Sequence, residues 1–135
     1  MPVCCAQKIM EPGDHLLREP FASEHDIRLR LRPDQTLTVD YLRSHLAAGS
    51  NSILLMDGSL EYFLTDYRTA VFYPVTLSEA RAWDFLVLPN WAPGMYAALG
   101  HSQSEFWRSV GDPSKFREVY RAPVDGGSIV YQILR

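Results

Sequence analysis

The chain has 135 residues, 47% of them hydrophobic and 21% charged, and its formal net charge is −3. This length suits a single domain, and the apolar fraction is large enough to offset the conformational entropy lost on folding. No apolar run reaches the ~20 residues that span a bilayer. The acidic excess disfavours nucleic acid, because its binders usually carry a basic surplus. We therefore expect one folded domain with no membrane partner, for which nucleic acid is an unfavoured ligand.

The cysteines and the amino terminus bear on the compartment. Cys4 and Cys5 are adjacent, so a bond between them would be strained, and no third cysteine is present. A chain without disulfides is typical of a reducing compartment. The first residues lack the charged and then apolar segments of a secretory signal, and arginine outnumbers lysine by 11 to 2. These features predict a bacterial, cytoplasmic protein whose cysteines are small apolar residues rather than nucleophiles.

The first predicted elements follow an irregular start. Residues 1–24 contain three prolines and leave room for one short strand at Val3–Ile9. Residues 27–32 alternate aliphatic side chains with arginines, a period of two that predicts a half-buried strand. Its outward face carries Arg28, Arg30 and Arg32. Such a row is either a solvated strand face or a site for phosphate, nucleic acid or an acidic partner.

Short helices are predicted at three places. Residues 38–48 repeat apolar side chains at helical spacing, between a capping threonine and a terminating glycine. Capping boxes at Thr76–Glu79 and Ser102–Glu105 mark the starts of two more helices. Residues 85–88 are either the end of the second helix or a buried strand, because periodicity alone does not separate the two.

The strongest local signal is Asp57-Gly58, which lies between the β-prone runs Ser52–Met56 and Ser59–Leu64. This pattern predicts an antiparallel hairpin with a type I′ turn, in which Gly58 has a positive φ. A third run, Thr69–Val75, extends the meander. Because Pro74 cannot donate a ladder hydrogen bond, this strand ends there or lies at an edge.

The carboxyl-terminal part predicts a second hairpin. Phe116–Arg121 and Ser128–Leu134 flank a turn whose glycines, Gly126 and Gly127, accept a positive φ. Strands then outnumber helices and follow one another in hairpins. The sequence predicts a single α+β domain over residues 1–135, with a mainly antiparallel, hairpin-rich sheet and two or three short helices.

The sequence contains no complete pattern typical of a catalytic site. Gly100–Ser104 approaches the Gly-x-Ser-x-Gly motif of serine hydrolases, but it ends in serine and no histidine follows His101. The four histidines are far apart, so no metal-binding spacing exists. No glycine-rich phosphate loop occurs. These absences favour a protein that is not an enzyme, assign no catalytic residue, and predict neither a metal nor a cofactor.

The aromatic residues between positions 83 and 107 form the main candidate contact surface. All three tryptophans lie here, and Trp91 stands between Pro89 and Pro93 in an expected loop. We predict that Trp91 lies outside strand structure with part of its indole exposed, because loops run over the surface and tryptophan is enriched in binding hot spots. The predicted partner-binding residues are Trp91, Tyr96, Arg108, Arg28, Arg30 and Arg32. The leading hypothesis is a non-catalytic module that binds another protein, such as an immunity protein, chaperone or adaptor, with a homo-oligomer left open.

The alternative hypothesis is a small-molecule-binding protein or small enzyme. A curved sheet crossed by a helix can enclose an aromatic-lined pocket that holds a few polar groups. The residues predicted for this pocket are Tyr62, Tyr73, Trp83, Trp107, Asp66, Asp84 and His101. A deep, mostly apolar cavity that contains one buried titratable group would favour this hypothesis.

Overall fold

The computed structural model describes residues 23–135, and the chain divides into two compact units, residues 1–33 and 34–135. The predicted strand Val3–Ile9, Cys4 and Cys5 lie outside the described residues. Helix α2 (Glu24–Leu31) belongs to the first unit, and the sheet belongs to the second.

The arginine row predicted as a strand is a helix. The Ser23 side chain accepts a hydrogen bond from the backbone N–H of Asp26 at 3.1 Å and so caps α2. Acidic residues occupy the first turn and arginines the last turn, which suits the helix dipole. This cap and the helix propensities of leucine, arginine and glutamate override the alternating pattern. Arg28 and Arg30 therefore lie on different sides of a helix, and Arg32 is its C-cap residue.

The second unit is built on a five-stranded mixed sheet with the strand order β2-β1-β3-β5-β4. The strands are β1 (Ser52–Leu55), β2 (Arg68–Val71), β3 (Phe85–Leu88), β4 (Phe116–Arg121) and β5 (Ile129–Ile133). β1 pairs in parallel with β2 and β3, whereas β5 runs antiparallel to β3 and β4. The predicted α+β class is confirmed, but the sheet is mixed rather than mainly antiparallel.

The predicted hairpin at Asp57-Gly58 is wrong. Gly58–Phe63 forms a 3₁₀ helix, η2, on the crossover between the parallel strands β1 and β2, and the φ of Gly58 is not positive. The Asp57 carboxylate accepts hydrogen bonds from the backbone N–H and hydroxyl of Ser59 at 3.0 and 2.7 Å. Aspartate supports a helix start in this way as readily as a turn. All four residues of β1 are buried, which is typical of a central strand with parallel neighbours.

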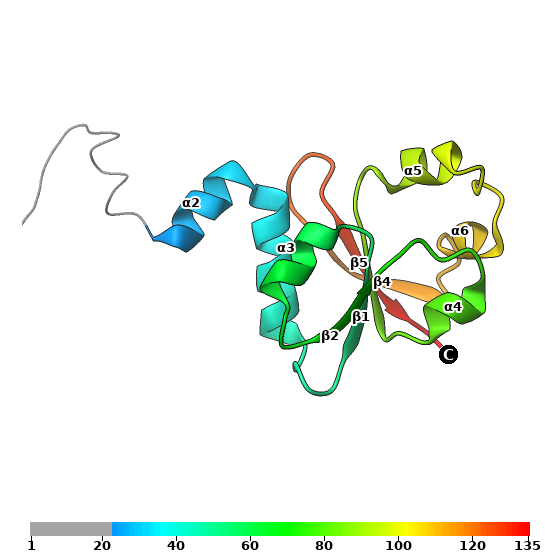
Figure 1. Cartoon of the computed structure of the whole chain (residues 1–135), viewed down its shortest axis with the longest axis horizontal. Coiled ribbons are helices and arrows are strands. Elements are labelled where there is room, and N and C mark those ends of the chain that lie inside the picture. Colours follow the sequence, from blue (N-terminus) through cyan, green and yellow to red (C-terminus); the bar gives the residue numbers. More distant parts are fainter. Residues whose placement is uncertain (1–22) are drawn as a thin grey trace, which may run out of the picture. The chain divides into compact units, whose positions relative to one another are not determined.

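Helices cover both faces of this sheet (Figure 1). The α-helices of the second unit are α3 (Pro33–His45), α4 (Leu77–Arg81), α5 (Ala92–Ala98) and α6 (Glu105–Ser109). On one face α3 and η2 pack against Ile53 and Leu55. On the other, α4, α5 and α6 pack against Leu54 and Leu86. Alternate residues of the central strands thus contribute to two separate cores.

Several local predictions are confirmed. The capping box of Thr76 and Glu79 starts α4, and residues 85–88 are a strand rather than a helix end. β2 ends before Pro74 and is an edge strand. β4 and β5 form the predicted antiparallel hairpin, and the φ of Gly126 in its turn is +64°.

Other boundaries differ from the prediction. α3 begins at Pro33, so Thr38 is a buried residue inside the helix rather than its cap. Ser104, not Ser102, caps α6, and the Glu105 carboxylate instead accepts a hydrogen bond from the Leu77 backbone N–H at 2.8 Å. Residues 23–135 hold six helices, η2 included, rather than two or three. No helix within residues 23–135 is long and apolar enough to cross a membrane.

Candidate protein-docking surface

The segment between Asp84 and Glu105 contains no aspartate, glutamate, lysine or arginine. It comprises the buried strand β3 and, after Pro89, helix α5. Trp91 is the N-cap residue of α5, and Pro93 lies in the first turn. Proline is tolerated there because the first N–H groups of a helix have no intrahelical partner. The segment therefore forms a helix without the charged face that solvated helices usually carry.

The inner face of α5 anchors the helix to the core. Ala92 and Tyr96 are fully buried, and the Tyr96 hydroxyl donates a hydrogen bond to the Pro74 carbonyl at 2.7 Å. The Tyr96 ring stacks on Trp107, with the ring centroids 4.6 Å apart. Burial raises the pKa of Tyr96, so its hydroxyl keeps the proton that it donates. These contacts fix which face of α5 points to solvent.

The outer face of α5 is exposed and apolar. Trp91 and Leu99 are 39% and 47% exposed, and the half-buried Met95 lies between them on the same flank of the helix. Gly94 lies beside Trp91, Met95 and Leu99. A Cβ on Gly94 would have no atom within 4 Å outside the adjoining helix backbone, so the surface is open at this position. The exposed residues of this face, here called the α5 surface, are Trp91, Pro93, Gly94, Ala97, Ala98 and Leu99.

A shallow recess continues the α5 surface toward the β4–β5 turn. It has a volume of about 310 Å³, and Pro93 and Asn90 form its wall on the α5 side. Gly126 and Gly127 also line it, and a Cβ on Gly126 would lie 2.6 Å from the Asn90 side-chain nitrogen. The other lining residues are Leu88, Pro89, Arg121, Val124 and Ile129. The recess adds a mostly apolar hollow to the apolar helix face.

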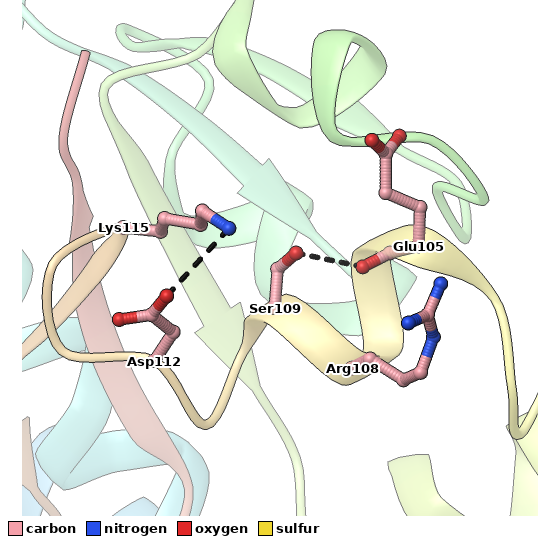
Figure 2. A pocket seen from close by; sticks show the side chains of 5 residues that line it. All are labelled: Glu105, Arg108, Ser109, Asp112 and Lys115. Carbon is pink, nitrogen blue, oxygen red and sulfur yellow. Dashed lines mark hydrogen bonds and ion pairs between the residues drawn. The ribbon is translucent and has the colours of Figure 1, made fainter.

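A second hollow, beside α6, is polar (Figure 2). Its volume is about 300 Å³, and it is lined by Glu105, Arg108, Ser109, Asp112 and Lys115. The Arg108 Nε donates to the Gln103 carbonyl at 3.0 Å, and the Ser109 hydroxyl donates to the Glu105 carbonyl at 2.7 Å. Two acidic and two basic side chains line this hollow, so their formal charges cancel.

Asp112 shows how these polar bonds order the loop after α6. Its carboxylate accepts hydrogen bonds from the hydroxyl and the backbone N–H of Ser114 at 2.7 and 2.9 Å. The Lys115 ammonium lies 3.6 Å from the other carboxylate oxygen. The bonds from Ser114, more than the lysine, lower the pKa of Asp112. The Asp112 carboxylate therefore stays ionised and holds Ser114 and Lys115 in the loop that follows α6.

The predicted partner-binding residues differ in burial and are divided between the two units. Trp91 lies outside strand structure and is partly exposed, as predicted. Tyr96 is fully buried, so a partner cannot reach it at the surface. Arg108 is exposed in the α6 hollow. The three remaining residues belong to the first unit: Arg28, Arg30 and Arg32.

The residues predicted for an aromatic pocket are also dispersed. Tyr62 is 78% exposed on η2, and the nearby Asp66 carboxylate forms an ion pair with Arg43 at 2.8 Å. Asp84 accepts hydrogen bonds from the backbone N–H and hydroxyl of Ser52 at 3.0 and 3.1 Å. Three aromatic residues are partly buried and pack against the core that α4, α5 and α6 cover: Tyr73, Trp83 and Trp107. His101, after α5, is partly exposed.

The predicted contact residues include Trp91 but none of the other residues of the α5 surface. The missed residues are small, and small residues alone suggest no chemistry. The signal available in the sequence was the absence of charged side chains between Asp84 and Glu105. Within residues 23–135, no group of three or more histidine, cysteine, aspartate or glutamate side chains is placed to hold a metal ion.

Comparison with known proteins gave no relative. No protein-family model matches the chain, and no curated protein and no solved structure shows significant similarity to it.

Proposed function

We propose that this chain is a non-catalytic protein-binding module and that the α5 surface is its docking face. The observation that carries the proposal is the exposed, charge-free outer face of α5, which is flanked by Trp91 and Leu99. Contiguous apolar patches on a protein surface mark interaction sites more often than isolated apolar residues do. Within this class, the proposed role is that of an immunity protein, chaperone or adaptor in the bacterial cytoplasm.

The partner that fits this surface is an amphipathic helix. Gly94 and Ala98 are four residues apart on α5 and leave its backbone open to close approach. Trp91, Met95 and Leu99 make a parallel ridge of larger side chains beside them. A ridge next to a groove is the geometry by which two helices interlock, and an apolar helix face laid in a groove is a recurring mode of peptide recognition. The recess at Pro93 can take one further apolar side chain of the partner.

The alternative, a small-molecule site, has weaker support. The residues predicted for it lie on two sheet faces and line no shared hollow among those described. Asp84 lines a hollow of about 170 Å³ with Arg68, and its carboxylate is already bonded to Ser52 and Arg135.

Photo-cross-linking in cells that express the chain tests the proposal. A photoreactive amino acid replaces Ala98 in one variant and Tyr62, an exposed residue of η2, in the control. We expect a cross-linked partner, other than a second copy of this chain, from position 98 that is absent from position 62, with the attachment mapped to a helix of that partner by mass spectrometry. Equal products from both positions, or none from position 98, would contradict the proposal.

The purified partner then allows a quantitative test. Ala98→Arg places a long charged side chain on an exposed helix position without entering the core, so the fold should be kept. We expect its Kd to rise at least tenfold, whereas Tyr62→Arg should leave the Kd unchanged. Circular dichroism and thermal melting confirm that both variants are folded. A folded Ala98→Arg chain with the wild-type Kd would overturn the assignment of the α5 surface.

A further inference from the structure

The two edges of the sheet differ in how they are protected. β4 carries Arg117, Glu118 and Arg121, and its pairing with β5 is interrupted by an irregularity between Glu118 and Tyr120. Charges and bulges of this kind prevent an edge strand from pairing with another chain. β2 pairs with β1 in unbroken register, and its only charged residue is Arg68. β2 therefore lacks the charges and the irregularity that protect β4.

The open hydrogen-bonding groups of β2 can be assigned. The Phe72 N–H donates to the Leu55 carbonyl of β1 at 3.2 Å. Successive residues of a strand direct their N–H and C=O groups to opposite sides, so Thr69 and Val71 direct theirs away from β1. Within residues 23–135, no hydrogen bond is made by these four backbone groups. Val71 is also 40% exposed, so this side of the strand is accessible.

We propose that β2 pairs antiparallel with β2 of a second copy of this chain, around a twofold axis at Ala70. In this register Thr69 faces Val71 of the second copy, and Val71 faces its Thr69. Both pairs are of the hydrogen-bonded kind, because these residues carry the open groups. Each pair supplies two hydrogen bonds, so all the open groups of Thr69 and Val71 on both copies are satisfied. The result is a continuous ten-stranded sheet.

The side chains of β2 suit this register. Ala70 lies at the axis, in a pair of the non-hydrogen-bonded kind where the two backbones approach most closely, and it is the smallest side chain of the strand. Thr69 and Val71 are both β-branched and lie opposite each other, which favours cross-strand packing. Arg68 lies opposite Phe72 of the second copy, so no like charges face each other.

The elements packed on the two faces of β2 leave its edge accessible to a second copy. The Thr69 hydroxyl bonds to the Glu61 carboxylate of η2 at 3.2 Å, and a Cβ on Gly58 would contact Val71 at 3.7 Å. These contacts place Thr69 and Val71 toward η2, where Tyr62 is 78% exposed. Arg68 lies on the opposite face, over the Trp83 ring at 4.3 Å. Because four-residue strands bury little area, we expect a weak, concentration-dependent dimer.

Disulfide trapping tests the register directly in the full chain with Cys4 and Cys5 replaced by serine. Ala70→Cys places two thiols at the axis, within the Cα separation that a disulfide accepts. We expect a covalent homodimer on mild oxidation. Thr69→Cys and Val71→Cys should each stay monomeric alone, and an equimolar mixture of the two should give a mixed dimer. No covalent dimer from Ala70→Cys, or equal yields from all three variants alone, would overturn the proposal.

Sedimentation velocity provides the second measurement. The wild-type chain should shift toward a dimer as its concentration rises. Val71→Pro removes an outward N–H without affecting the ladder to β1, and it should stay monomeric with a native circular dichroism spectrum. If Val71→Pro fails to fold, Val71→Lys puts a charge on the same edge and should give the same result.

Ala98→Arg should dimerise as the wild type does, which separates this proposal from the α5 surface. A wild-type chain that is monomeric at every concentration, or a folded Val71→Lys variant that dimerises normally, would overturn it.

Discussion

Gly127 shows how a single residue sets the geometry of the β4–β5 turn. Its φ is not positive, so any residue could adopt its backbone conformation, yet a Cβ there would lie 2.3 Å from the Ala122 carbonyl oxygen. That contact is with backbone, which cannot move aside without disturbing the Ala122–Ser128 hydrogen bond of 3.0 Å. We expect Gly127→Ala to lower the free energy of unfolding by about 1–3 kcal/mol, measured by urea denaturation.

Gly49 provides the matched control for this substitution. No atom lies within 4 Å of its Cβ position, and its φ is also not positive. Gly49→Ala should therefore be neutral or stabilise the fold by about 0.4–1 kcal/mol, because alanine restricts the unfolded chain. Equal effects of the two substitutions would show that the close approach at Ala122 does not determine the outcome.

At the scale of the element, the start of α4 depends on a reciprocal cap. The Thr76 hydroxyl accepts a hydrogen bond from the Glu79 N–H at 3.3 Å, and the Glu79 carboxylate accepts one from the Thr76 N–H at 2.9 Å. α4 has only five residues, so a large share of its backbone groups lies at its ends. We expect Thr76→Ala to lower the free energy of unfolding by about 1 kcal/mol, measured by thermal or urea denaturation. Thr65→Ala, at an exposed threonine outside any helix, should change it far less, and an equal loss would count against the cap.

Elements defined by local chemistry were predictable, and those defined by distant neighbours were not. The capping box of α4 and the glycine turn of the β4–β5 hairpin depend on residues a few positions apart, and both predictions are confirmed. The pairing of β1 depends on β3, some thirty residues later in the chain. Asp57-Gly58 is compatible with both a hairpin turn and the start of η2. Because β1 is buried on both faces, it needs neighbouring strands and helices that the Asp-Gly pair does not specify.

The candidate site likewise has one part with a local sequence signal and another part that depends on distant contacts. The flanking prolines predicted an exposed loop around Trp91. Trp91 is partly exposed, but the loop prediction is wrong, because Trp91 is the N-cap residue of α5 and Pro93 lies in the first turn of that helix, where proline is tolerated. The side of α5 that faces the core depends on Tyr96 reaching Pro74 and Trp107, which belong to other segments. Until that face is known, Ala97 and Ala98 cannot be placed at the surface from sequence.

For the whole molecule, several carboxylates accept hydrogen bonds that lower their pKa values, two of them between distant segments and one within the cap of α4. The hydrogen bond from the Ser52 N–H lowers the pKa of Asp84, with further lowering by the Ser52 hydroxyl and Arg135. The backbone N–H groups of Thr76 and Val75 lower the pKa of Glu79. The hydrogen bond from Arg43 lowers the pKa of Asp66. In each case the folded chain releases its proton more readily than the unfolded chain.

The sign of the pH dependence follows from these directions. A carboxylate with a lowered folded pKa stabilises the fold above the unfolded pKa, and this contribution is lost as the pH falls through the folded pKa. We therefore expect the free energy of unfolding to be level at neutral pH and to decrease from about pH 4 downward. Urea denaturation at a series of pH values measures this slope.

Asp84→Asn should lower the free energy of unfolding at neutral pH, because the amide removes the charge that Ser52 and Arg135 bind. It should also flatten the acid slope. Asp125→Asn, at an exposed carboxylate, is the control and should change the free energy of unfolding at neutral pH far less than Asp84→Asn. An acid slope that is as steep in Asp84→Asn as in the wild type would show that the link between β1 and β3 through Asp84 does not contribute to acid unfolding.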